Sequence, residues 1–169
     1  MLISKELNDA INAQIGREFG ASLQYINIAT YLDAEALVNM AKFFYLQADE
    51  EHMHAMKFVE YIVDAGGKVS IPPVNAPQST FTTVEEAVKL PLDWEMEVTH
   101  QINDLMDIAV EKKDYIAQQF LNWFTNEQLE EVSLMDQLLS VVKRAGEANL
   151  FLVDQMVLDL RAEAGSEAA

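Results

Sequence analysis

Two residues one helical turn apart could bind a metal ion together. Glu51 and His54 are separated by three positions in a segment whose apolar residues recur with helical spacing. Side chains at i and i+3 lie on one face of a helix, so a carboxylate and an imidazole at this spacing can reach a shared ion. A lone Glu-x-x-His is more often a solvated surface pair, so the interpretation depends on what the rest of the chain supplies.

Each long helical segment carries a carboxylate where its own pattern demands a core residue. Counting in steps of seven, four acids lie between two residues of an inner stripe: Ile11–Glu18–Tyr25, Phe44–Glu51–Phe58, Val88–Glu95–Ile102 and Phe124–Glu131–Leu138. Burying unpaired carboxylates costs several kcal/mol each, and no Lys or Arg falls at a matching inner position. A multivalent cation is the remaining counter-charge, and oxygen-rich ligands with one imidazole suit iron or manganese.

Further polar and aromatic residues accompany these acids. Glu50, Glu127 and Glu130 are sequence neighbours of the first set, and are either additional ligands or a solvated charged edge. Tyr25 and Trp123 are expected near the site, as core aromatics or as functional groups. The other two histidines, His52 and His100, are expected on the surface or at an interface rather than as ligands.

Composition excludes several kinds of function. The 169 residues include 28 Asp and Glu against 11 Lys and Arg, a formal charge of −17, which repels nucleic acid and anionic membrane. The chain has no Cys, so disulfides, thiolate zinc sites and iron–sulfur clusters are excluded. Neither a targeting segment nor an apolar run of ~18 residues is visible, so a cytoplasmic protein is the default expectation; a mature secreted form with its signal removed would give the same sequence pattern.

Glycines, prolines and capping residues divide the chain into helices. They predict helices over residues 4–33, 38–65, 83–113, 115–145 and 148–161, a proline-rich connection over 68–83, and a boundary or kink near Leu90, before Pro91. We therefore expect one domain over residues 1–162 and a flexible tail over 163–169.

The predicted fold is all-α. Four helices of similar length pack as a bundle, and short links make the first and second, and the third and fourth, antiparallel neighbours. The long connection can travel the length of the bundle, which makes the second and third helices parallel. One long crossover is the ferritin-like bundle topology, here with a short fifth, C-terminal helix.

At this level of detail the sequence resembles the non-haem ferritins of bacteria and archaea, from about residue 7 to 160. The resemblance is carried by Arg17-Glu18, by Glu50-Glu51-His52-Met53-His54-Ala55-Met56, by Trp94-Glu95, and by the run 120–131, Phe-Leu-Asn-Trp-Phe-Thr-Asn-Glu-Gln-Leu-Glu-Glu. The segment Leu150-Phe151-Leu152-Val153-Asp154 is similar to the start of the family's C-terminal helix.

The resemblance implies a ferroxidase centre and iron storage. Matched position by position, the first iron is held by Glu18, Glu51 and His54, and the second by Glu51, Glu95 and Glu131, with Glu51 bridging and Gln128 nearby. A third, looser site matches Glu50, Glu127, Glu130 and Glu131, and Tyr25 and Trp123 match the aromatic pair beside the centre. The implied chemistry is oxidation of Fe(II) by dioxygen or hydrogen peroxide and storage of ferric oxide in a shell of 24 identical chains, without nucleic acid or membrane as partners.

Two departures from related patterns matter. Bacterioferritins carry a second Glu-x-x-His, where this chain has Gln128 and Glu131, and their haem-ligating Met falls where this chain has His52; no haem is therefore expected. Animal ferritins line a three-fold pore with carboxylates at positions matching Gln118 and Leu121, neither of which is acidic. The usual route for iron into the shell is therefore in question.

Three other functions remain open from the sequence. A small di-iron oxidase or peroxidase without mineral storage shares the inward acids and differs in assembly. A DNA-protecting mini-ferritin is opposed by the fifth helix and the acidity. A purely structural bundle predicts that replacing Glu18 or Glu51 by Gln or Leu raises stability and leaves iron oxidation unaffected.

Overall fold

The computed structural model describes residues 2–167, with side chains to residue 162, and the fold in this part of the chain is all-α. Four long helices, α1 (Lys5–Ala34), α2 (Val38–Asp64), α3 (Val84–Glu111) and α4 (Tyr115–Ala145), are followed by the 3-10 turn η1 (Glu147–Asn149) and by α5 (Leu150–Glu167). Three of the long helices begin at a side-chain cap, in which Ser4, Thr83 or Asp114 accepts a bond from a first-turn N–H. No helix of the described residues is long and apolar enough to cross a membrane.

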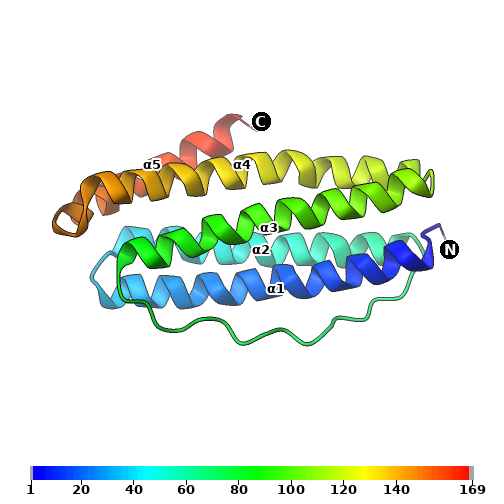
Figure 1. Ribbon diagram of the computed structural model, residues 1–169, viewed down its shortest axis with the longest axis horizontal. Helices are drawn as coiled ribbons and strands as arrows, with labels where there is room; N and C mark the ends of the chain where they lie inside the picture. Colours follow the sequence, from blue (N-terminus) through cyan, green and yellow to red (C-terminus); the bar gives the residue numbers. More distant parts are fainter. Residues whose placement is uncertain (1, 168–169) are drawn as a thin grey trace.

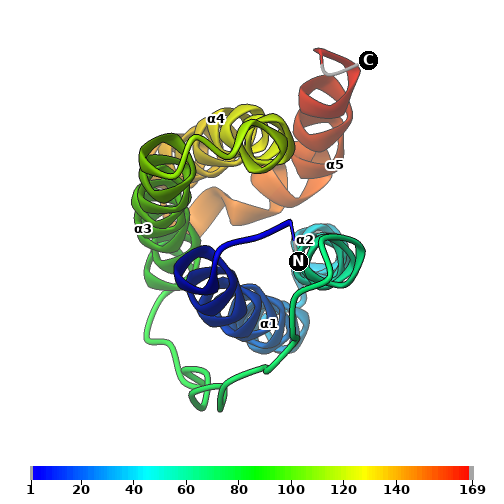
Figure 2. The ribbon, with the colours of Figure 1, turned by 90° about the vertical axis from the view of Figure 1, so that its right-hand side faces the viewer.

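The helices form a bundle with one long crossover, as predicted. α1 runs antiparallel to α2 and α3 antiparallel to α4, while the connection between α2 and α3 travels the length of the bundle beside α1, so that α2 and α3 are parallel (Figure 1). Seen end-on, α5 lies outside the four-helix bundle, beside α4 and α2 (Figure 2).

The crossover is fixed by amide side chains of α1. Asn8 and Asn12 donate to the carbonyl of Lys68 and accept from the N–H groups of Lys68 and Ser70, and Gln24 makes the same reciprocal pair with Gln78. These bonds satisfy backbone groups of a segment that has no helix or strand partners of its own.

The core consists of two apolar clusters with a polar layer between them. One cluster includes Tyr25, Phe44, Val88 and Leu138, and the other includes Ile11, Phe58, Ile102 and Phe124. Each predicted inner stripe therefore reaches both clusters, and the acid at its middle falls in between. This position places four carboxylates inside one bundle.

Two predicted helix boundaries were wrong. Near Leu90 the prediction was a boundary or a kink, and the boundary is wrong, since α3 continues through Pro91, which is buried inside the helix. The apolar residues on both sides of it pack into the core and outweigh one missing backbone hydrogen bond. α5 extends beyond the predicted end at residue 161 to Glu167, through most of the expected tail; residues 168 and 169 lie outside the described part.

Candidate metal centre

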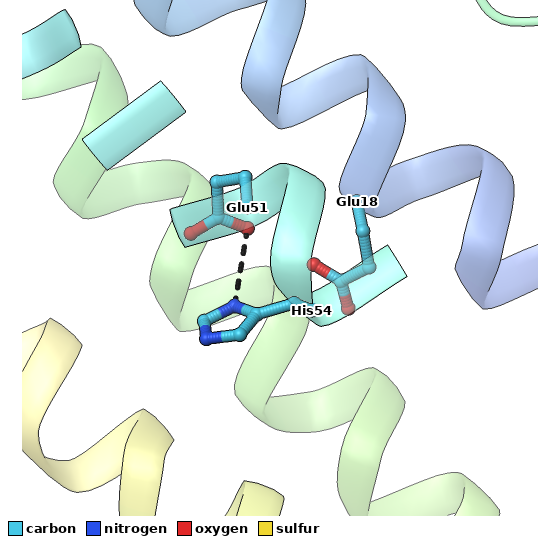
Figure 3. Close-up of side chains that lie close together, drawn as sticks. All are labelled: Glu18, Glu51 and His54. Carbon is cyan, nitrogen blue, oxygen red and sulfur yellow. Dashed lines mark ion pairs between the residues drawn. The ribbon is translucent and has the colours of Figure 1, made fainter. Parts of the chain in front are cut away.

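Three side chains from α1 and α2 form the best-defined metal-binding group. Glu18, Glu51 and His54 are each at most 2% exposed, and one ligand atom of each lies within 4.8 Å of the other two. Figure 3 shows the Glu18 carboxylate turned toward the pair that Glu51 and His54 make on one face of α2. The His54 Nδ1 atom lies 3.6 Å from Glu51 Oε2, so the helical spacing does place the two groups together.

Glu95 from α3 and Glu131 from α4 complete the set of inward acids. They are 1% and 4% exposed. Gln128 Nε2 donates to Glu95 Oε2 at 3.1 Å, and the Tyr25 hydroxyl donates to the other oxygen of the same carboxylate. All four acids predicted to face the core are therefore buried.

Buried glutamine amides hold three of the four carboxylates. Besides Gln128 on Glu95, Gln14 donates to Glu18 Oε1 at 2.7 Å and Gln47 donates to Glu131 Oε2 at 2.8 Å. An amide orients a carboxylate without neutralising it. Among the described residues, no Lys or Arg side chain forms an ion pair with any of the four acids. His54 lies beside Glu51, but its lowered pKa leaves it neutral at neutral pH, so it does not balance their charge.

Burial makes these groups resist ionisation. It raises the pKa of Glu18 to about 7, and raises the pKa of Glu95. Burial, followed by the charge of Glu95, raises the pKa of Glu51 and of Glu131 well above the ordinary value. Desolvation lowers the pKa of His54 to about 4, which leaves its ring neutral and able to donate a lone pair to a metal at neutral pH.

Three ligand atoms in this region have no hydrogen-bond partner. They are Glu18 Oε2, Glu51 Oε1 and His54 Nε2, and they belong to the same group of three side chains. Orphaned acceptors of this kind are costly in a protein interior. A divalent cation bound among the acids would satisfy the two carboxylate oxygens, and hard oxygens with one imidazole form a suitable donor set. The His54 Nε2 atom points to the other side, where it lies 3.9 Å from Glu127 Oε1.

A second, more open group of acids lies on the other side of His54. Ligand atoms of Glu50, His54 and Glu127 lie within 4.8 Å of one another, and the distance from His54 Nε2 to Glu127 Oε1 is 3.9 Å. Glu130 lines a pocket of about 60 Å³ together with Glu50, Glu127 and Glu131. His54 therefore lies between the buried centre and this outer pocket.

The two aromatic residues lie near the centre and the remaining two histidines lie on the surface. Tyr25 is fully buried, and the half-buried Trp123 makes an edge-on contact with His54 at a ring distance of 5.5 Å. The ammonium of Lys57 lies 4.3 Å from the Trp123 ring. His52 and His100 are exposed.

Sequence reasoning missed three residues around the centre. Gln14 and Gln47 carried the same signal as the acids, a polar side chain on an inner face, but an amide is a weaker anomaly than a charge. Arg161, which pairs with Glu50, gave no local signal because its position depends on how α5 packs. Leu121, matched to a pore position, is fully buried in the core, and Gln118, matched to the other, donates to the Ala109 carbonyl.

Comparison with known proteins agrees with this fold. A family profile described as a ferritin-like domain matches residues 8–145. A protein of Mycolicibacterium smegmatis named Ferritin BfrB is 42% identical over 93% of this chain and 86% of its own length. A bacterial non-heme ferritin of Staphylococcus aureus is 38% identical over 86% of this chain and 88% of its own length.

The same relationship is found among solved structures. An open pore ferritin from the hyperthermophilic archaeon Archaeoglobus fulgidus superimposes with a TM-score of 0.89 and 29% sequence identity, over 92% of this chain and 96% of that one. A four-helix bundle with one crossover and an inner layer of carboxylates defines a class of helical metal-binding proteins. Within that class, the chain belongs to the ferritin-like family, and the named relatives support a bacterial non-haem ferritin, the resemblance that the motifs indicated.

Proposed function

We propose that this chain stores iron and oxidises Fe(II) at a two-iron centre built by Glu18, Glu51, His54, Glu95 and Glu131. The single observation that carries the proposal is the buried layer of four carboxylates without a basic partner among the described residues. Family membership supports iron storage, and the oxidation step is our inference from the donor set.

The residues divide into two ligand groups that share Glu51. Glu18, Glu51 and His54 would hold one Fe(II), and Glu51, Glu95 and Glu131 the other. Gln128 and Tyr25 would fix the Glu95 carboxylate, because both donate to it. Preorganised ligands on four helices would hold two ions close enough to react with one oxidant molecule.

The electron count requires both ions. Two Fe(II) give up one electron each, and one dioxygen takes up these two electrons and two protons to leave as hydrogen peroxide. Hydrogen peroxide can itself act as oxidant, taking two electrons and two protons from two further Fe(II) to give two waters. Hydrolysis of Fe(III) then returns protons and yields the ferric oxide that is stored.

The outer acids extend this path. We propose that Glu50, Glu127, Glu130 and Glu131 form a third iron site through which ions pass between the centre and the storage space. The storage space requires an assembly, and the resemblance implies a hollow shell of 24 chains. No haem is part of the proposal, because His52 replaces the Met that would bind it in bacterioferritins.

The proposal is tested by loading metal-free protein with Fe(II) without oxygen, then admitting air and following the absorbance of Fe(III). Wild-type protein should oxidise two Fe(II) per chain in a fast phase. Glu131→Ala should slow that phase at least tenfold, since it removes a ligand of the second ion. Asp136→Ala, which removes an exposed carboxylate from the same helix, is the matched control; wild-type oxidation no faster than buffer would refute the proposal.

A further inference from the structure

One basic side chain enters the acidic pocket of the proposed third site. Arg161 Nη2 donates to Glu50 Oε2 at 2.6 Å, and both side chains are 23% exposed. In the described part of the chain, the ion pairs that Lys residues make with Asp or Glu join side chains that are 36% to 85% exposed. The Arg161–Glu50 pair is therefore the only one of these pairs that lies largely out of solvent, where a charge acts more strongly.

Glu50 has two competing uses. Its carboxylate belongs to the group that could bind a metal with His54 and Glu127, and it also accepts the bond from Arg161. The pocket that these acids share with Arg161 measures about 60 Å³, enough for very few water-sized ligands. A cation bound there must share Glu50 with a guanidinium in the same small space.

The fold holds Arg161 in place from the other end of α5. Asp154, seven residues before Arg161 and so on nearly the same helix face, accepts from the N–H groups of Asn39 and Met40 at 2.8 Å, at the beginning of α2. Val157, between the two, is fully buried. α5 is thus attached to α2 at two points, and Arg161 does not depend on a free tail for its position.

We propose that Arg161 is a built-in counter-cation of the outer pocket, which weakens cation binding there and keeps the third site a place of transit. The proposal rests on the function proposed above. A guanidinium stays charged at all working pH values, so it repels any incoming divalent ion and occupies one oxygen of Glu50. The buried centre, which has no such partner, keeps its ions more tightly than the pocket beside it.

The test is calorimetric titration of the metal-free protein with Zn²⁺, which binds oxygen and imidazole ligands without being oxidised. Wild-type protein should show a tight class of sites and a weaker class. Arg161→Gln should tighten the weaker class about tenfold, the typical effect of removing one nearby like charge, and leave the tight class unchanged. Arg161→Lys, which keeps the charge, should resemble wild type, and so should Arg144→Gln, which removes an exposed Arg from α4.

Three results would overturn the proposal: unchanged or weaker Zn²⁺ binding in Arg161→Gln, equal tightening in Arg161→Lys, or equal tightening in Arg144→Gln. Arg161→Met removes the charge but keeps a long, unbranched side chain, and it replaces the Gln variant if circular dichroism shows that the latter does not fold. Rapid Fe(II) oxidation by wild-type protein is measured on the same preparation. If it is present while Zn²⁺ affinity does not respond to Arg161, only the role of Arg161 fails.

Discussion

At the scale of single residues, the centre is a set of groups that the folded chain holds in an unfavourable state. Burial is the largest cause of the raised pKa at Glu18, Glu51, Glu95 and Glu131, and the charges of neighbouring carboxylates raise the pKa of each of them further. The amides of Gln14, Gln47 and Gln128 orient carboxylates without removing their charge. The metal-free protein is therefore less stable than the same bundle would be with apolar residues at these positions.

These pKa shifts predict that the metal-free protein loses stability as pH rises from 6.5 to 8. An acid with a raised folded-state pKa keeps its proton in the folded state after the unfolded chain has released it, so the free energy of unfolding falls from about pH 4.5 through the folded pKa. Glu18 completes this change near pH 7, and the raised pKa values of Glu51 and Glu131 act in the same direction. We expect Glu18 alone to lower the free energy of unfolding by roughly 1 kcal/mol between pH 6.5 and 8.

Measuring between pH 6.5 and 8 separates the contribution of the acids to stability from that of His54. A histidine whose pKa is lowered to about 4 gives the opposite slope, since stability falls as pH drops from 6.5 toward 4. Above pH 6.5 this contribution is complete. Denaturant unfolding with a chelator, at one fixed protein concentration, measures the slope; Glu51→Gln should flatten it, and a stability that rises with pH in wild type would contradict the prediction.

At the scale of elements, the sequence predicted the helices well because their ends and inner faces follow local rules. Capping residues and heptad stripes depend on neighbours within a few positions, so Ser4, Thr83 and the four inward acids could be identified from them. The breaks at Ala36 and Lys113 carry no glycine although both residues have positive φ. The sequence predicted these two breaks only as short links between helical patterns.

Features that depend on distant packing could not be predicted in the same way. Pro91 is tolerated because the residues around it in α3 are buried, and Arg161 reaches Glu50 because α5 folds back onto α2. Gln14 and Gln47 share a face with the acids, but only the three-dimensional arrangement shows which oxygen each one meets. Local patterns were therefore enough to predict the candidate ligands, whereas the positions of the groups around them depend on tertiary packing.

Two glycines of α1 give a matched test of how tightly the crossover packs. A Cβ on Gly16 would lie 2.5 Å from Pro72 Cγ, a rigid ring, whereas a Cβ on Gly20 would meet Trp94 and Val74 at 3.6 Å, an ordinary contact. Ala improves helix propensity by about 1 kcal/mol at either position. We expect Gly16→Ala to destabilise the protein by about 1–3 kcal/mol through overpacking and Gly20→Ala to stabilise it slightly, as measured by denaturant unfolding. Equal effects of the two substitutions would show that the crossover shifts to make room for the added Cβ atom.

At the scale of the whole molecule, one outer face is apolar in a chain whose charge is −17. Leu23 and Ile26 of α1 and Tyr45, Leu46, Met53 and Met56 of α2 are 38% to 48% exposed. Contacts of Ser22 with Ala48 and of Phe19 with His52 place these helix segments side by side. Large exposed apolar patches mark surfaces that bind other proteins, so we expect this α1–α2 face to be buried between chains in an assembly.

Substitutions on the α1–α2 face allow oxidation and storage to be tested separately, because every ligand of the proposed centre comes from one chain, whereas storage requires the assembly. Met53→Glu places a charge on the α1–α2 face without touching the centre, and should lower the mass of the assembly measured by light scattering; Met53→Leu, which keeps the face apolar, should not.

The Met53→Glu variant should keep the fast oxidation of two Fe(II) per chain but precipitate iron added beyond a few ions per chain. Wild-type protein should keep that iron in solution, eluting with the protein. If wild type also precipitates the excess while it oxidises Fe(II) rapidly, the chain is a small di-iron oxidase and the storage role is wrong, since a closed shell is the physical requirement for holding a mineral that is otherwise insoluble.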